Sequence, residues 1–234
     1  MKRFRPAAWT WLVFLPMLAL LLWLGSWQVR RAHEKQALLD GYARAAHAEP
    51  QTLDPNASAS NDAPVSVQAS GTYLGDRQLL LDNQSHDGRP GYHVWTPMRL
   101  AAGPLIVVDR GWIERPPRAE LPNPSAPSEA MQIRGLWRAL PRPGLRLGAA
   151  SSQALQKFPA TVEYPTAEDL RVLLGEPVAA GVLLLDPSAD AGFVREWNPA
   201  GTFPPSRHYG YAAQWFALSA ALLVLFIIVN RKPT

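Results

Sequence analysis

The chain has 234 residues, a formal net charge of +4 and no cysteine. This length allows one or two domains. The basic residues are spread along the chain, whereas a nucleic-acid-binding protein gathers them on one face, so nucleic acid is not an expected partner. The absence of cysteine excludes disulfides, thiolate nucleophiles, zinc–cysteine sites and covalently attached c-type heme.

A first apolar segment, WTWLVFLPMLALLLWLGSW, occupies residues 9–27 and contains no charged side chain. It is long enough to cross a hydrocarbon core of about 30 Å as a helix. Tryptophans stand at both of its ends, as they do at membrane–water interfaces. A cleaved signal peptide is the alternative, because the basic start MKRFR fits one. The apolar run is too long for that, and no small-residue cleavage site follows it, so we expect a transmembrane helix.

A second apolar segment occupies residues 211–229 and is followed by NRKPT. Basic residues flank the outer ends of both segments, so the positive-inside rule predicts that residues 1–8 and 230–234 are cytoplasmic. The basic residues in VRRAHEK, just after the first segment, favour the opposite orientation, but a long loop can translocate despite such charges. We therefore expect a two-pass protein of a bacterial inner membrane, with residues 28–210 in the periplasm. No Ser- and Arg-rich transit peptide precedes the first segment.

The region between the spans has the composition of a folded domain. Residues 30–49 have helical spacing and are expected to extend the first span outward. Residues 52–64, 85–91 and 116–130 are rich in turn formers and proline, and predict irregular connections. Short runs suited to β-strands make up most of the remainder, at residues 65–74, 77–84, 91–100, 104–113, 131–140 and 181–186.

One further helix is predicted within YPTAEDLRVLLG. Thr166 is a suitable N-cap, and Asp169 follows three residues later, as in a capping box. Gly175 and then Pro177 end the helical pattern. Because strands outnumber helices, the predicted fold is two transmembrane helices flanking a periplasmic, antiparallel-rich β (α+β) domain.

His208, directly before the second apolar segment, is the first candidate site residue. On a helix, Tyr211 and Trp215 share its face, which becomes apolar further along. The remaining members of this face are Ser219, Leu222 and Phe226. An imidazole above a flat apolar surface suits a non-covalently held porphyrin, with His208 ligating the iron and Arg207 meeting a propionate. The alternative is an ordinary interfacial belt of aromatic side chains.

Gln214 lies inside the second span, where an amide needs a hydrogen-bond partner. Gln28 stands at the same membrane face on the first span, so we expect the two amides to pair the spans. His33 would also lie near this face if the first helix continues, and could act as a second axial ligand. The alternative for His33 is a solvated histidine on a helix surface.

Asp109 and Arg110 follow an apolar strand and precede Gly111 in VVDRGWI. We interpret them as a pair that fixes a strand end, with Gly111 supplying an unusual backbone angle. The histidines of HDGRPGYH, residues 86–93, lack the convergent spacing of a metal site. No hydrolase elbow, phosphate loop or dinucleotide fingerprint occurs in the sequence, so an enzyme is not expected.

Four blocks of the sequence together resemble one family, the Surfeit-locus cytochrome c oxidase assembly factors (the Surf/Shy proteins). LGSWQVRRAHEK resembles the family's Leu-Gly-x-Trp-Gln-x-x-Arg-x-x-x-Lys signature, and VVDRGWI resembles its Val-x-Arg-Gly-Trp block. GYHVWTPM resembles its Gly-Tyr-x-Val-x-Thr-Pro block, and HYGYAAQWF resembles its His-x-x-Tyr-Ala-x-Gln-Trp-Phe block. The matched positions are Trp27, Gln28, Arg31, Lys35, Gly91, Tyr92, Thr96, Pro97, Arg110, Gly111, Trp112, His208, Tyr211, Gln214, Trp215 and Phe216. The sequence departs from the pattern at Gln84 and Asp109, where many members have Arg and Asn.

The resemblance implies an inner-membrane assembly factor for heme–copper oxidases of the aa3 type. Members of this family are linked to heme a, which they are proposed to bind transiently through the histidine that matches His208. The implied partners are the catalytic subunit of the oxidase, the lipid bilayer and, as a possible source of the cofactor, the heme a synthase. A different class of function also stays open: a cofactor-free membrane chaperone that holds the catalytic subunit.

Overall fold

The computed structural model describes residues 2–4, 6–117, 120–141, 157–197, 199, 201 and 203–233. It divides the chain into two units. The first unit combines Met1–Asp40 with Asn198–Thr234, and the second is Gly41–Trp197. The first is a pair of helices and the second is a β domain, so the predicted fold class is confirmed.

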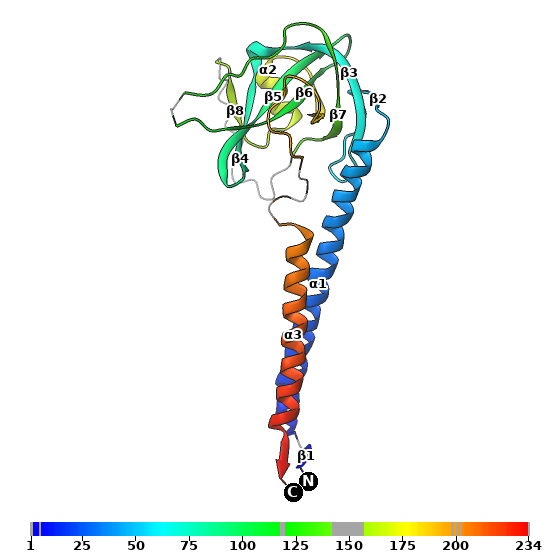
Figure 1. Ribbon diagram of the computed structural model, residues 1–234, viewed down its shortest axis with the longest axis vertical. Coiled ribbons are helices and arrows are strands. Elements are labelled where there is room, and N and C mark those ends of the chain that lie inside the picture. The colour runs from blue at the N-terminus through cyan, green and yellow to red at the C-terminus, as the bar shows by residue number, and fades with distance from the viewer. Residues whose placement is uncertain are drawn as a thin grey trace. The chain divides into compact units, whose positions relative to one another are not determined.

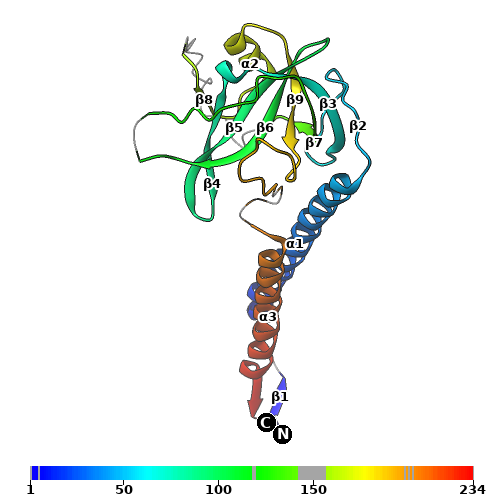
Figure 2. The ribbon, with the colours of Figure 1, turned by 45° about the horizontal axis from the view of Figure 1, so that its top comes forward.

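The helix pair consists of α1 (Ala8–His47) and α3 (Pro205–Val229), which lie side by side (Figures 1 and 2). The first apolar segment and the predicted helix that follows it form one continuous element, because no helix-ending signal separates them. Two short strands, β1 (Lys2–Phe4) and β10 (Arg231–Pro233), pair antiparallel and bring the ends of the chain together.

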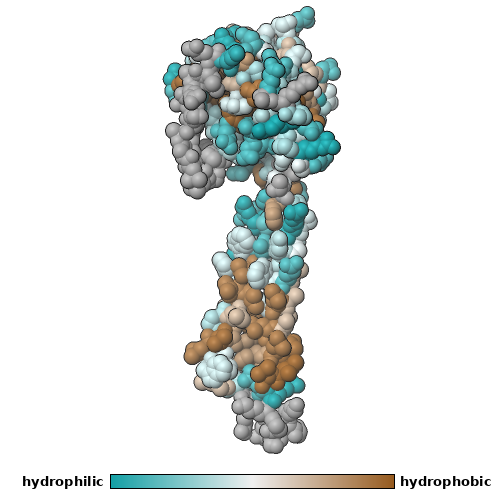
Figure 3. Space-filling view, turned by 90° about the vertical axis from the view of Figure 1, so that its left-hand side faces the viewer, coloured by the Kyte–Doolittle hydropathy of each residue, from teal (hydrophilic) through white to brown (hydrophobic). Residues whose placement is uncertain are grey.

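Both helices are long and apolar enough to cross a membrane. Their hydrophobic side chains are mostly exposed, and they gather on the part of the pair nearest the chain ends (Figure 3). A surface of this kind is suited to lipid rather than to water. The positions at which the membrane begins and ends on each helix, and the orientation of the pair, stay predictions.

The two helices pack through aromatic rings and one glycine. Phe14 of α1 stacks on Phe226 of α3, with ring centroids 3.9 Å apart. A Cβ atom added at Gly25 would lie 2.7 Å from the Phe216 ring, so the glycine lets that ring approach the backbone of α1. Small residues serve the same purpose wherever membrane helices pack closely.

The β domain contains an eight-stranded sheet in the order β2-β3-β7-β9-β6-β5-β4-β8. An additional pairing between β3 and β5 closes β3, β7, β9, β6 and β5 into a ring, as Figure 2 shows. All neighbours in this ring are antiparallel except β6 and β9. The strands are β2 (Gln51–Thr52), β3 (Val65–Tyr73), β4 (Leu79–His86), β5 (Arg89–Leu100), β6 (Leu105–Glu114), β7 (Met131–Ala139), β8 (Ala160–Val162) and β9 (Val178–Leu185).

The core of the β domain lies inside this ring. Alternate residues of β6, such as Ile106 and Val108, join a cluster with Tyr73, Met98 and residues of the other ring strands. The intervening residues of β6 are buried on its other face. A strand buried on both faces holds its polar side chains at fixed positions, and β6 carries two of them, Asp109 and Arg110.

The short elements show where the sequence prediction succeeded and where it failed. Helix α2 (Ala167–Leu174) has the predicted capping box, in which Thr166 and Asp169 bond reciprocally. The connection predicted over residues 85–91 is too long, because β4 and β5 continue to a tight turn at Asp87 and Gly88, both with positive φ. Strands β2 and β8, and the single-turn helix η1 (Gly75–Arg77), were not predicted because each is too short to show a period.

Candidate functional site

His208 lies in the first turn of α3, which begins after Pro204 with a proline at its first position. Only 8% of its surface is exposed. Its Nδ1 atom lies 2.7 Å from Oε1 of Gln28 on α1. An amide oxygen can only accept, so Nδ1 carries the proton and donates it to Gln28. Because a neutral imidazole has a single N–H, the Nε2 atom is then left with a free lone pair.

The Nε2 atom of His208 is buried and has no hydrogen-bond partner. An unpartnered buried polar atom destabilises a fold by about 1–3 kcal/mol, so its retention suggests a ligand. Within the described residues, no group of three or more His, Cys, Asp or Glu side chains converges on a metal position. This nitrogen therefore suits a metal that brings its other ligands with it, as a porphyrin brings its four nitrogens to iron.

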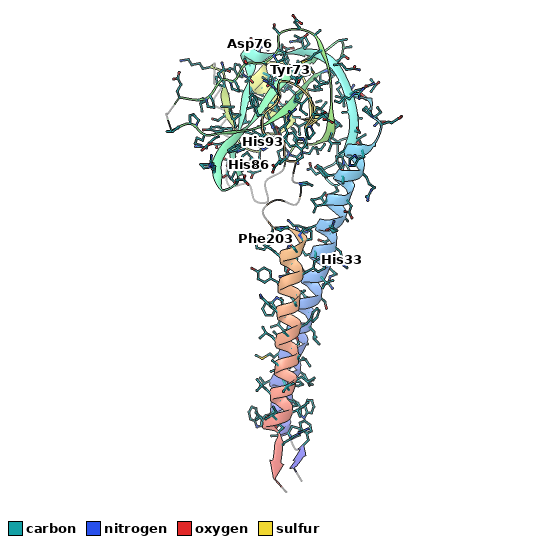
Figure 4. The ribbon with its side chains drawn as sticks, in the orientation of Figure 1. His33, Tyr73, Asp76, His86, His93 and Phe203 are labelled. Atoms are coloured by element: carbon teal, nitrogen blue, oxygen red, sulfur yellow. The ribbon has the colours of Figure 1, made fainter. Side chains whose placement is uncertain are left out.

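One aromatic side chain lies beside the His208 ring, and a second stacks on the first. The Phe203 ring lies 5.8 Å from it, centroid to centroid, and stacks on Tyr211 at 6.4 Å. The Arg207 guanidinium lies over the same Phe203 ring, with Cζ 5.2 Å from its centroid. Figure 4 shows Phe203 at the start of α3. The sequence analysis missed Phe203, because nothing in its neighbourhood marks a phenylalanine outside the helix as part of the site.

The predicted pairing of Gln28 with Gln214 is wrong. Gln28 accepts a hydrogen bond from His208 instead, and the Gln214 side chain is exposed on α3. His208 and Gln214 lie six residues apart on α3, nearly two turns of helix, and the rotation and position of α3 against α1 decide which of them meets Gln28. Two other residues that match the family signature lie on the outside of α1: Trp27 is 43% exposed, and Arg31 forms an exposed ion pair with Glu34.

The predicted aromatic and apolar face of α3 is divided rather than continuous. Its deeper part contacts α1, since Ser219 is buried and Phe226 stacks on Phe14. Tyr211, by contrast, is 42% exposed, and Trp215 is half-buried between the two parts. The prediction of a flat apolar surface open to a porphyrin is therefore wrong for the deeper part of this face, because α1 covers it.

His33 lies on the exposed surface of α1, with its ring edge-on to Tyr209 at a centroid distance of 6.0 Å (Figure 4). This arrangement fits the solvated-histidine interpretation. Its role as a second axial ligand stays a prediction.

Arg110, on the inner side of β6, is buried and is hydrogen-bonded through all three guanidinium nitrogens. Nε and Nη2 both donate to the Ala191 carbonyl, and Nη2 also donates to the Ser125 carbonyl. Nη1 lies 3.4 Å from acceptors on Gln78 and Thr96. Arg110 thus ties two irregular segments to the ring of strands, which is a structural role.

Burial is the main influence on the pKa values of two side chains at the inner side of β6, Arg110 and Tyr73. Burial lowers the pKa of the Arg110 guanidinium, and it raises the pKa of Tyr73 to about 12. The guanidinium lies over the Tyr73 ring at 5.5 Å. The positive charges of Arg110 and Arg195 act on Tyr73 in the opposite direction from burial, but they are the smaller effect.

Asp109 does not pair with Arg110, so the predicted ion pair is wrong. Consecutive residues of a strand face opposite sides, and both lie within β6 rather than at its end. Asp109 accepts instead from His93 Nδ1 at 2.9 Å and from Trp95 Nε1 at 3.0 Å. It also accepts from the backbone N–H of Gly111, whose φ of +109° favours glycine, as predicted.

Two helices able to cross a membrane, joined to a β-barrel domain, define a membrane-anchored protein, and the helix pair carries a buried histidine nitrogen without a partner. The model of the SURF1 family matches residues 15–220 of the chain. The chain therefore belongs to the SURF1 family, a family of cytochrome oxidase assembly factors rather than of enzymes.

Curated relatives agree with this assignment. A SURF1-like protein of Monosiga brevicollis is 26% identical over 89% of this chain and 83% of its own length. A SURF1-like protein of Rickettsia felis is 23% identical over 94% of this chain and 96% of its own length. A SURF1-like protein of Dictyostelium discoideum is 28% identical over 47% of this chain and 44% of its own length. The first two matches each cover most of both chains.

Proposed function

We propose that this chain assists the assembly of an aa3-type heme–copper cytochrome c oxidase by binding heme a and passing it to the catalytic subunit. Membership of the SURF1 family supports the oxidase as the target. One observation carries the heme part of the proposal. The Nε2 atom of His208 is buried without a partner, while the other ring nitrogen is already engaged by Gln28.

The surroundings of His208 supply what a porphyrin needs besides an iron ligand. Phe203 and Tyr211 present stacked aromatic faces that can pack on the macrocycle. The Phe203 ring is 40% exposed and lies beside the His208 ring, so it can move to admit a ligand without opening a core. Arg207 can exchange its contact with Phe203 for a charge-assisted hydrogen bond to a propionate. Trp215, one turn further along α3, extends the aromatic surface.

A carrier has to release its cargo, and a single histidine ligand suits release because only one bond to iron must break. The proposed carrier is a two-pass protein of the bacterial inner membrane with both termini cytoplasmic. In this arrangement the β domain is periplasmic and His208 lies near the periplasmic surface of the bilayer. The heme a synthase is the proposed source of the cargo, and the catalytic subunit of the oxidase is its destination.

The proposal is tested by purifying the full chain in detergent from cells that make heme a and recording its absorption spectrum. We expect a Soret band with heme a character in the wild type. His208→Ala should lose the band, because the iron ligand is gone. His33→Ala is the matched control, since it removes an exposed histidine of α1, and it should keep the band. A Soret band retained in full by His208→Ala would contradict the proposal.

One observation favours a second function, a cofactor-free chaperone for the catalytic subunit. The deeper part of the aromatic face of α3 is buried against α1, which leaves less surface for a porphyrin. A chaperone of this kind would use the exposed apolar side chains of α3 to hold a neighbouring helix. A colourless wild-type protein that still captures the catalytic subunit would select this function over the first.

A further inference from the structure

The hydrogen bond between Gln28 and His208 joins the two helices at the ligating residue itself. Gln28 is half-buried on α1, and its Oε1 atom lies 2.7 Å from Nδ1 of His208 on α3. The bond holds the imidazole ring of His208 in one orientation, and it determines which ring nitrogen carries the proton. The unprotonated nitrogen, Nε2, is the one that is buried without a partner.

We infer that Gln28 is a positioning residue for heme a binding: it holds His208 in the tautomer that ligates iron and sets the strength of that ligand. The inference rests on the proposed function and goes beyond it. Metal-ligating histidines generally donate their other N–H to an acceptor, and the acceptor governs both the ring orientation and the basicity of the ligating nitrogen. Gln28 occupies the place of that acceptor.

The same chain holds another histidine in a contrasting way. His93 Nδ1 contacts both carboxylate oxygens of Asp109, at 2.9 Å each, and Asp109 is buried. A carboxylate makes Nε2 of its histidine a stronger ligand than a neutral amide does, because it draws the Nδ1 proton more strongly. Gln28 therefore gives His208 orientation with only moderate ligand strength. This combination is suited to a heme that has to be released.

The first test measures the tautomer of His208 in the full chain without heme. Nitrogen-15 NMR of the histidine rings is recorded in detergent micelles, and the His208 signals are assigned by their loss in His208→Ala. We expect the proton on Nδ1 in the wild type, and a mixture of tautomers in Gln28→Leu. A proton on Nε2 in the wild type would overturn the inference, because the amide of Gln28 would then be donating to the ring.

The second test measures heme a affinity and reduction potential. Gln28→Leu should weaken binding by about 10–100-fold, the usual effect of removing such an acceptor. Gln28→Glu should bind at least as tightly as the wild type and lower the reduction potential of the bound heme, because a carboxylate strengthens the ligand. Gln36→Leu is the matched control, since Gln36 bonds to Asp40 on the exposed face of α1, and it should change neither quantity.

The outcomes separate the inference from the proposed function. If the wild type binds heme a through His208 and Gln28→Leu binds it equally well, the inference fails and the proposed function stands. If the wild type binds no heme a, the proposed function fails, and the positioning role for heme fails with it. A Gln28→Glu variant with an unchanged potential would contradict the claim that residue 28 sets ligand strength.

Discussion

The β domain and the helix pair differ in the kind of buried polar group that each leaves without a partner. In the β domain, the buried charges of Asp109 and Arg110 are each bonded to several partners. In the helix pair, the one buried histidine uses one nitrogen for a partner and leaves the other free. Five other buried atoms of the described residues also lack partners, and all belong to the Gly41–Trp197 unit: Tyr42 Oη, Asn61 Oδ1, Trp112 Nε1, Trp137 Nε1 and Arg138 Nε. None of them is an imidazole nitrogen, and the last three are N–H donors without a free lone pair.

The difference indicates which region holds the fold together and which one binds. Fully bonded polar groups fix a structure, because every change leaves a partner unsatisfied. An unpartnered acceptor adds nothing to stability and is available to a ligand. Substitutions in the β domain should therefore change stability, and substitutions around His208 should change binding.

The largest effect is expected from Asp109→Ala. The change leaves the donors of Trp95, Gly111 and His93 without their buried acceptor, so the free energy of unfolding should fall by about 3 kcal/mol or more. Denaturant unfolding of the full chain in detergent measures this loss. Asp62→Ala is the control, because Asp62 is exposed, and it should change stability by less than about 0.5 kcal/mol. Equal effects of the two variants would contradict the structural role of Asp109.

High pH should weaken the β domain through Tyr73. Burial raises its pKa to about 12 from the ordinary tyrosine value of 10.0. The unfolded chain therefore loses this proton at a lower pH than the folded chain does, and the stabilisation present below pH 10 is lost as the pH approaches 12. Each pH unit in this window removes up to about 1.4 kcal/mol. The free energy of unfolding of Tyr73→Phe should not show this fall between pH 10 and 12. If its dependence on pH were identical to that of the wild type, the role given to Tyr73 would be contradicted.

In the helix pair, Gly25→Leu should separate α1 from α3. A side chain at this position meets the Phe216 ring, and overpacking of this kind destabilises by about 1–3 kcal/mol. Titration with sodium dodecyl sulfate, followed by tryptophan fluorescence, reports the loss of helix pairing. Heme a affinity should fall as well, because the bond from Gln28 to His208 spans the same two helices. The second change Phe216→Ala should restore pairing, and failure to do so would show that the two positions are not in contact.

The smallest effect is expected at the start of α2. Thr166→Ala removes the capping box and should destabilise the β domain by about 1 kcal/mol. Val172→Ala is the control on the same helix, because Val172 is 55% exposed, and it should cause no loss. Heme a binding should be unchanged in both variants. A change in binding would break the division of roles between the two regions.

The sequence predicted the parts of the fold that depend on local patterns. The two apolar segments, the main strands and the cap at Thr166 are each visible as a run or a spacing within about a dozen residues. Closure of the ring through β3 and β5 was not predictable, because that pairing joins strands separated by β4. The short strands β2 and β8 are fixed only by the neighbours they pair with.

The candidate site was predictable in its residues but not in its contacts. His208 and Gln28 were both identified, yet Gln28 was assigned to Gln214, because sequence spacing does not give the rotation of one helix against another. The pair Asp109–Arg110 failed for a related reason: adjacent residues suggested an ion pair, but a strand directs them to opposite faces. Contacts between distant segments decided both cases.

The central claim is that His208 ligates the iron of heme a, and resonance Raman spectroscopy of the reduced, heme-loaded full chain tests it most directly. The protein is prepared with natural histidine and with nitrogen-15 histidine, so that a vibration between iron and a histidine nitrogen shifts on labelling. We predict an iron–histidine stretching band that shifts with the label, persists in His33→Ala and disappears in His208→Ala. A heme-loaded protein whose band is insensitive to the label, or survives in His208→Ala, would contradict the claim.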